Sequence, residues 1–311
     1  IIRGLVGSEM CIRDRINYYH SLIFFNLCIF LSAFEFLRNN DPLIFCLFLI
    51  LSLGISHGAL DHLKGAKLLK IYNYRSTLLF YVSYIFVGLS VIIFWLIFPK
   101  LILILFLIVA SYHFGKEDSE FINSSANFEF IYFLKGCVII VAPLIFHKSE
   151  TLAIFEYLNF EISESFLINN YFLWLILILG FIANILISLS QNFETKSLLL
   201  MDYISILILN YFLNPLLAFT IYFCFLHSAR HSFKLSNELN NKSLIEGFKK
   251  FTLKAIPLTI LTAILFVISL IILKNYYVLD NAISKIIFIG LASLTFPHIL
   301  LEYLLEKNEK K

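Results

Sequence analysis

Six of the eight histidines of this chain lie in four short motifs, each at the end of a hydrophobic segment. Imidazole binds zinc, copper, iron and nickel, so histidines from several segments can build one metal centre. Ionisable groups inside apolar segments are costly, and by default they indicate a functional site. In sequence order the motifs are HGALDH (residues 57–62), HFGKED (113–118), HSARH (227–231) and PHILLE (297–302).

The spacing within the motifs suits ligand binding. His227 and His231 are four residues apart, so on a helix they share a face and can bind the same ion. A carboxylate near a ligating histidine commonly fixes the tautomer of that histidine. When an acid and a histidine lie one turn apart on the same helix, the acid more readily contacts an imidazole on a neighbouring helix. An acid follows a histidine by four residues in three pairs: His57 and Asp61, His113 and Glu117, and His298 and Glu302.

The composition indicates a membrane protein. Of the 311 residues, 60% are hydrophobic and only 14% are charged, and the mean hydropathy is +0.87. Apolar runs of about 20 residues recur, each long enough to cross a bilayer as a helix. Because unpaired backbone groups are costly in lipid, and no alternating pattern is present, we predict an all-α integral membrane protein. Its fold class would be a polytopic bundle of about 8–10 transmembrane helices with a central intramembrane metal site.

Apolar runs and turn residues predict ten spans along this bundle. They are Tyr18–Leu37, Pro42–Gly58, Thr77–Phe98, Leu101–Gly115, Phe128–Phe146, Phe166–Leu189, Leu198–Leu213, Pro215–His231, Ala255–Leu273 and Ala282–Leu305.

The start of the chain is unusual. It begins at Ile1, and Gly4–Arg15 resembles translated adapter sequence without the apolar core of a signal peptide. We therefore expect residues 1–15 to be a non-native or disordered segment, with a genuine polar tail as the alternative. Residues 16–311 would form a single polytopic membrane domain.

The distribution of Lys and Arg predicts the orientation. Basic residues gather in the loops 63–76 and 232–254, whereas the loop 147–165 is acidic. Ten spans in the inner cell membrane, with both termini cytoplasmic, satisfy all three loops. The four spans that carry motifs then run in the same direction, and their histidines lie at depths that agree within about 6 Å. We therefore expect these helices to converge on one ion.

In this order and on hydrophobic spans, the four motifs resemble the Brp/Blh family of membrane β-carotene 15,15′-dioxygenases. The resemblance covers nearly the whole chain from about Tyr18. It implies O2-dependent cleavage of the central double bond of β-carotene to two retinal molecules at a non-haem Fe(II) ion. The residues themselves do not separate iron from zinc. By motif, the implied ligands are His57, His113, His227 and His231.

The same motifs contain further candidates for supporting the ligands or lining the substrate site. In HFGKED the spacing alone selects Glu117, whereas the family pattern favours Asp118. We expect Asp118, because Gly115 can end the helix. The full set of further candidates is Asp61, His62, Asp118, Arg230, His298 and Glu302.

The resemblance also implies the partners. They are β-carotene and O2 as substrates, the lipid bilayer, and a rhodopsin-type protein as a recipient of retinal. The substrate supplies the electrons that O2 needs, and no GxGxxG motif signals a nicotinamide or flavin cofactor. The net charge of +3 gives no indication of a nucleic-acid partner, and no CxxC pair indicates a disulfide or zinc-knuckle framework.

Two other functions remain open. A membrane lipid desaturase or hydroxylase would carry adjacent HH pairs, and this chain contains no HH. A transporter of a metal ion or small solute would show inverted repeats with broken helices in matching halves, and the sequence shows no such pairing.

Overall fold

The structure is a computed structural model that describes residues 2–34, 37, 42–74, 76–122, 129–160 and 170–309. These residues form helices and connecting turns, and no strand occurs among them. Seven of the described helices are long and apolar enough to cross a membrane. The chain is therefore an all-α, multi-pass membrane protein, as the composition predicted. The basic loop residue Arg75 and the acidic loop residues Glu161 and Glu164 lie outside the described residues.

Seven of the ten predicted spans correspond to helices that are long and apolar enough to cross a membrane. The spans predicted at 18–37, 198–213 and 215–231 stay predictions. The seven qualifying segments are Leu43–Ile71, Thr77–Ile97, Pro99–Glu117, Glu129–Phe146, Asn170–Ser188, Leu244–Leu273 and Leu279–Asn308.

The described helices group into two compact units, and each is considered by itself. The first unit comprises Ile1–Pro42, Ala110–Leu152 and Ile162–Arg230. The second comprises Leu43–Val109, Ala153–Glu161 and His231–Lys311. The single polytopic domain over residues 16–311 and the non-native status of residues 1–15 stay predictions.

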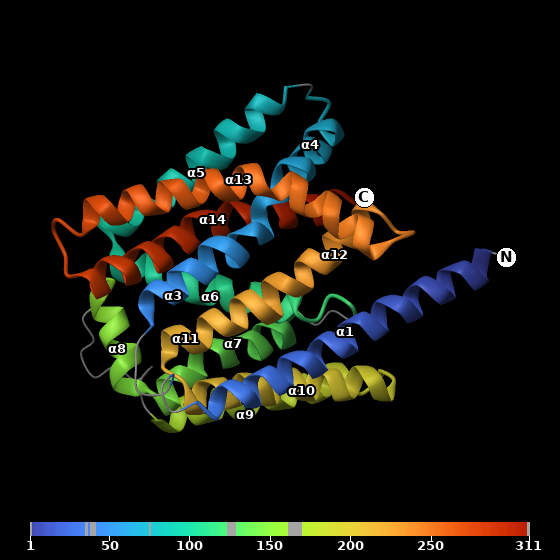
Figure 1. Cartoon of the computed structure of the whole chain (residues 1–311), viewed down its shortest axis with the longest axis horizontal. Helices are drawn as coiled ribbons and strands as arrows, with labels where there is room; N and C mark the ends of the chain where they lie inside the picture. Colours follow the sequence, from blue (N-terminus) through green and yellow to red (C-terminus); the bar gives the residue numbers. More distant parts are fainter. Residues whose placement is uncertain are drawn as a thin grey trace. The chain divides into compact units, whose positions relative to one another are not determined.

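The first unit contains α1 (Ile2–Ser32), the end of α6 (Pro99–Glu117), α7 (Glu129–Phe146), α9 (Asn170–Ser188) and α10 (Phe193–Phe212). It also contains the first part of α8 (Lys148–Tyr157), α11 (Pro215–Ile221) and the π-helix η4 (Tyr222–Ser228). Helix α7 packs against α9, and α1 lies along α10 (Figure 1). Side-chain caps start two of these helices, because Asn192 accepts from the Thr195 amide and Asn214 from the Leu217 amide.

The second unit begins with a helical stretch that changes its winding three times. Helix α3 (Leu43–Leu49) passes into the π-helix η1 (Ile50–Gly54), then the 3-10 helix η2 (Ile55–Leu60), then α4 (Asp61–Ile71). The unit also holds α5 (Thr77–Ile97), the beginning of α6, α12 (Ala229–Leu239) from His231 onward, α13 (Leu244–Leu273) and α14 (Leu279–Glu309). Helix α14 packs against α5, α4 and α13, and η2 packs against α13.

The most lipid-compatible helices of the second unit are α5 and α13. In each of these helices, only 6% of the most apolar 18-residue segment is buried inside the protein. Their remaining apolar side chains face outward, which suits helices surrounded by lipid tails. Helix α14 is different, because half of its most apolar 18-residue segment is buried. It is therefore an interior helix, and it carries one of the four histidine motifs.

Candidate metal-binding groups in the two units

Five of the six histidines in the four motifs are almost completely buried, and each of these five lies on a different element; the sixth, His62, is partly buried. The exposed fractions of the five range from 1% to 7%. Buried imidazoles need hydrogen-bond or metal partners, so their neighbours indicate their role. The elements are η2 for His57, α6 for His113, η4 for His227, α12 for His231 and α14 for His298.

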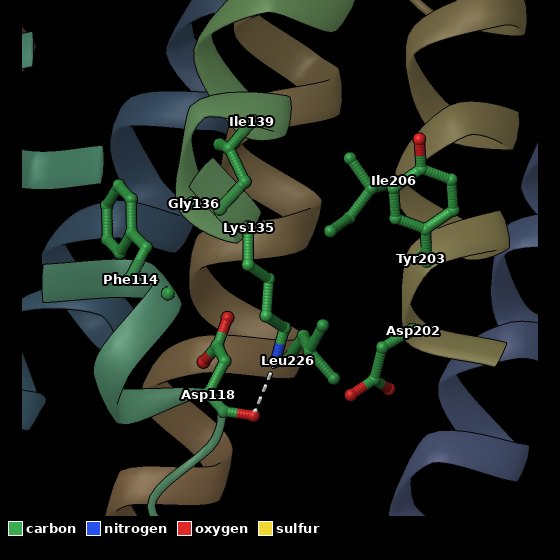
Figure 2. A pocket seen from close by; sticks show the side chains of 10 residues that line it. Phe114, Asp118, Lys135, Gly136, Ile139, Asp202, Tyr203, Ile206 and Leu226 are labelled. Carbon is green, nitrogen blue, oxygen red and sulfur yellow. Dashed lines mark hydrogen bonds between the residues drawn. The ribbon is translucent and has the colours of Figure 1, made fainter. Parts of the chain in front are cut away.

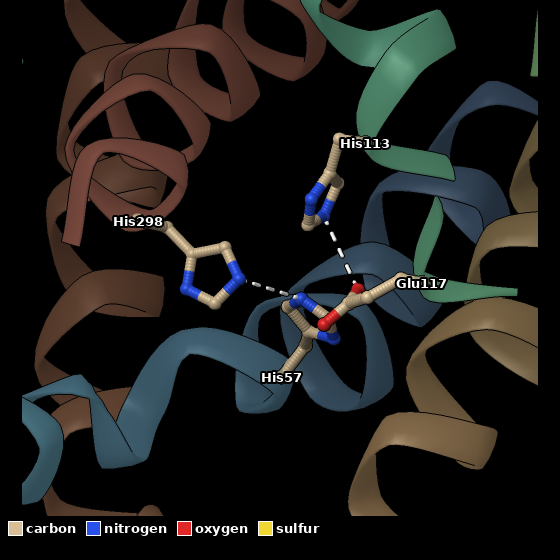
Figure 3. Close-up of side chains that lie close together, drawn as sticks. All are labelled: His57, His113, Glu117 and His298. Carbon is tan, nitrogen blue, oxygen red and sulfur yellow. Dashed lines mark hydrogen bonds and ion pairs between the residues drawn. The ribbon is translucent and has the colours of Figure 1, made fainter. Parts of the chain in front are cut away.

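In the first unit, two imidazole nitrogens approach the same carboxylate oxygen. Glu117 Oε2 lies 3.1 Å from His227 Nε2 and 3.3 Å from His113 Nε2. Figure 3 shows His113 and Glu117 one turn apart on α6, with their side chains directed toward each other. Two nitrogens and one oxygen therefore lie close together in a buried setting.

The opposite edge of the His227 ring is held by Asp118. His227 Nδ1 lies 3.0 Å from Asp118 Oδ1, and the Tyr222 hydroxyl donates to Asp118 Oδ2 at 2.5 Å. Burial alone would raise the pKa of the Asp118 carboxyl, but its contact with the His227 ring, and then the charges of Arg230 and Lys135, hold that pKa below its usual value. Asp118 thus fixes the ring so that Nε2 faces Glu117.

Two cationic side chains, Lys135 and Arg230, lie near Asp118. Lys135 Nζ donates to the Asp118 carbonyl at 3.1 Å and to Ser119 Oγ at 2.6 Å. Arg230 pairs with Asp202 at 2.9 Å and donates to Ser21 Oγ at 2.8 Å. Figure 2 shows a small cavity between Lys135, Asp118 and Asp202, with the Lys135 ammonium directed at the Asp118 backbone. Arg230 therefore acts in charge balance in this unit.

In the second unit, His298 is held in the same manner by Asp61. His298 Nδ1 lies 2.8 Å and 2.9 Å from the two Asp61 oxygens, and the Tyr84 hydroxyl donates to Asp61 at 2.8 Å. His298 Nε2 lies 3.2 Å from His57 Nε2, and Figure 3 shows these two nitrogens directed toward each other. The His231 ring lies 4.0 Å from the His57 ring, centroid to centroid.

Two other candidates have different surroundings. His62 is partly buried and its Nδ1 contacts the Ala59 carbonyl at 3.0 Å. Glu302 forms an ion pair with Lys64. The contacts of these two residues thus do not place them beside the histidines of the second unit.

One local expectation was wrong. Gly115 does not end helix α6, which continues to Glu117. A Cβ atom at Gly115 would lie 1.8 Å from the Tyr132 carbonyl of α7, so this glycine permits a close helix approach. Glu117 and Asp118 consequently both reach His227, the first at Nε2 and the second at Nδ1. Sequence reasoning missed Tyr84 and Tyr222 entirely, because neither lies in a motif.

The donor atoms in each unit fit a metal ion. His113 and Glu117 in the first unit, and His57 and His298 in the second, each offer a ligand atom of a suitable type. With a metal–nitrogen bond of about 2.1 Å, two adjacent ligand atoms on one ion lie about 3.0 to 3.4 Å apart. The contacts at 3.1 Å and 3.3 Å to Glu117, and at 3.2 Å between His57 and His298, fall in this range.

Known proteins resemble this chain over most of its length. A family model described as beta-carotene 15,15'-dioxygenase matches residues 48–306, a range that contains all four histidine motifs. The chain is 27% identical over 266 residues to the protein named Beta-carotene 15,15'-dioxygenase from uncultured marine bacterium 66A03. That match covers 81% of this chain and 90% of the relative. No solved structure matches the chain.

Proposed function

Because the chain belongs to the β-carotene 15,15′-dioxygenase family, we propose that it cleaves the central double bond of β-carotene with O2 and releases two retinal molecules. The observation that carries the proposal is the family match, which includes every histidine motif. The buried imidazole and carboxylate groups of the two units support it, since they have the composition of a metal centre.

We propose that one Fe(II) ion is held by His57, His113, His227 and His231. In the first unit His113 and His227 both lie within 3.3 Å of Glu117 Oε2, and in the second the His57 and His231 rings lie 4.0 Å apart, centroid to centroid. The helical stretch from Pro215 to Leu239 is uninterrupted, so His227 and His231, four residues apart, belong to one continuous helix. Glu117 would place a negative charge beside these neutral ligands, because its Oε2 lies within 3.3 Å of two imidazole nitrogens.

The reaction balances without another cofactor. A ferrous ion, when bound, supplies the one-electron chemistry that lets O2 react with a closed-shell polyene. One double bond of the substrate breaks, and each of its carbons becomes an aldehyde carbon with one oxygen from O2. The chain's own residues hold the site for this reaction: Asp118 and Asp61 orient two imidazoles through Nδ1.

Aromatic rings next to His227 make its surroundings suitable for a polyene. The Phe114 ring lies 4.8 Å from the imidazole, and the Phe223 ring lies nearly parallel to it at 5.8 Å. Phe219 continues this row, because its ring stacks on Phe223 at 5.5 Å. Such rings exclude water and offer the apolar contact that a bilayer-soluble hydrocarbon needs. We propose that β-carotene enters from the membrane and lies along them.

Expression of the full chain in bacteria that accumulate β-carotene tests the function. The expected result is loss of the orange colour and appearance of retinal by chromatography. The variants His227→Ala and His231→Ala should lose both activity and bound iron, whereas His147→Ala should keep both. Intact β-carotene in cells with normal amounts of the membrane protein would refute cleavage, and products of unequal length would refute cleavage at the central bond.

A further inference from the structure

His298 is a polar residue inside an apolar helix. It follows Pro297 on α14, and only 3% of its surface is exposed. A lone histidine in such a position more often forms a single hydrogen bond to a neighbouring helix. Both edges of the His298 ring have defined neighbours, however, and these neighbours assign it a more specific role.

The Nδ1 edge of His298 is held by a carboxylate that is itself held. Both oxygens of Asp61 lie within 2.9 Å of Nδ1. The Tyr84 hydroxyl donates to Asp61 at 2.8 Å, from a different helix. A carboxylate at Nδ1 keeps the proton there and makes Nε2 the basic nitrogen that can bind a metal. Tyr84 and Asp61 together therefore fix both the orientation and the tautomer of the ring.

The Nε2 edge of His298 faces another imidazole nitrogen. His57 Nε2 lies 3.2 Å away, and His57 is itself a proposed iron ligand. A hydrogen bond between the rings would require a proton on one of these nitrogens. A shared cation accommodates both as neutral ligands, at a separation expected for two ligands of one ion.

The first unit contains the same arrangement around a proposed ligand. There Tyr222 donates to Asp118, Asp118 contacts His227 Nδ1, and His227 Nε2 faces Glu117 at 3.1 Å. Thus a tyrosine, an aspartate and a histidine are connected in the same order in both units. In the first unit the histidine held in this way is one that the family resemblance assigns to the metal.

We infer that His298 is a further ligand of the iron ion, and that Asp61 and Tyr84 position it. This inference rests on the proposed function for the identity of the ion. It extends the ligand set beyond the four histidines to a residue on α14. Asp61 and Tyr84 are positioning residues, since they act through the His298 ring.

Cobalt(II) binding tests the inference without the need for catalysis. The full-length protein in detergent is titrated with Co(II), and the visible absorption of the bound ion reports its coordination. We expect His298→Ala to weaken Co(II) binding at least tenfold and to change the visible spectrum. Added imidazole should restore the spectrum by occupying the vacated position. Asp61→Asn should weaken binding by about 10- to 100-fold, and Tyr84→Phe by less than Asp61→Asn.

Leu301→Ala is the matched control, because Leu301 is a buried residue three positions further along α14. It should lower the unfolding temperature and leave the Co(II) spectrum unchanged. Wild-type affinity and an unchanged spectrum in His298→Ala would overturn the inference while leaving the four-histidine site intact. A spectral change that imidazole cannot restore, matched by Leu301→Ala, would assign His298 a packing role. A wild-type protein that binds no Co(II) would overturn this inference and the proposed metal site together.

Discussion

Replacement of Asp118 by Asn changes one charge beside His227 with almost no change in volume. Asp118 accepts from His227 Nδ1 through Oδ1 and from Tyr222 through Oδ2. In Asn one of these oxygens becomes an NH2 group, which cannot accept a hydrogen bond. One of the two bonds is therefore lost, and a buried donor faces another donor. We expect iron binding to weaken by about 10- to 100-fold.

The size of this effect follows from the lost contact. Leaving one buried hydrogen-bonding group unsatisfied costs about 1 to 3 kcal/mol. A 10- to 100-fold change in affinity corresponds to about 1.4 to 2.7 kcal/mol, so the two values agree. The assay is anaerobic dialysis of the purified protein against a series of buffered Fe(II) concentrations, with the bound iron measured by mass spectrometry.

Asp202→Asn is the matched control in the same unit. Asp202 is as deeply buried as Asp118 and pairs with Arg230 at 2.9 Å. Its replacement should lower thermal stability, because Arg230 loses a charged partner, but it should change iron affinity less than threefold. The reasoning is refuted if Asp118→Asn binds iron as tightly as the wild type, or if Asp202→Asn weakens iron binding equally.

Three further predictions concern packing, metal and oxygen. Gly136→Ala should destabilise the protein by about 1 to 3 kcal/mol, because the new Cβ would lie 1.7 Å from the Ser111 carbonyl of α6; a wild-type unfolding temperature would contradict this close approach. Removal of iron with a chelator should abolish retinal formation, and Fe(II) should restore it more than Zn(II), which has no redox chemistry; equal recovery with zinc would exclude the iron mechanism. With 18O2, and with immediate borohydride reduction to prevent exchange, each retinol should carry one 18O atom by mass spectrometry. Label in only one half of the products would indicate that water supplies the other oxygen.

The elements that position the site were predictable where the hydrophobic pattern is strong. The runs that end at the motifs predicted the helices that carry His57, His113 and His298, because a span needs about 20 apolar residues. The winding within them was less predictable. The structure has a 3-10 helix over Ile55–Leu60, which the apolar pattern does not indicate. The π-helix over Tyr222–Ser228 contains no Gly or Pro that would indicate it in the sequence.

The partners of the histidines depended on contacts between helices, which spacing cannot supply. The i+4 spacing identified Asp61 and Glu302 as candidate supports. Asp61 contacts His298 on another helix, as expected for an acid that serves a neighbouring helix, whereas Glu302 pairs with Lys64. Tyr84 lies 23 residues from Asp61, so no local pattern connects them. Gly115 was misread as a helix end, because a glycine that permits close packing and one that terminates a helix look the same in a sequence.

Carboxylates lie beside the buried histidines of each unit and favour a bound cation there. In the first unit Glu117 Oε2 lies within 3.3 Å of two imidazole nitrogens. In the second unit Asp61 contacts His298 Nδ1, while Lys64 pairs with Glu302. Buried charge without compensation is costly in an apolar environment. Within each unit, a cation bound by neutral imidazoles would therefore offset the negative charge of the carboxylate beside them.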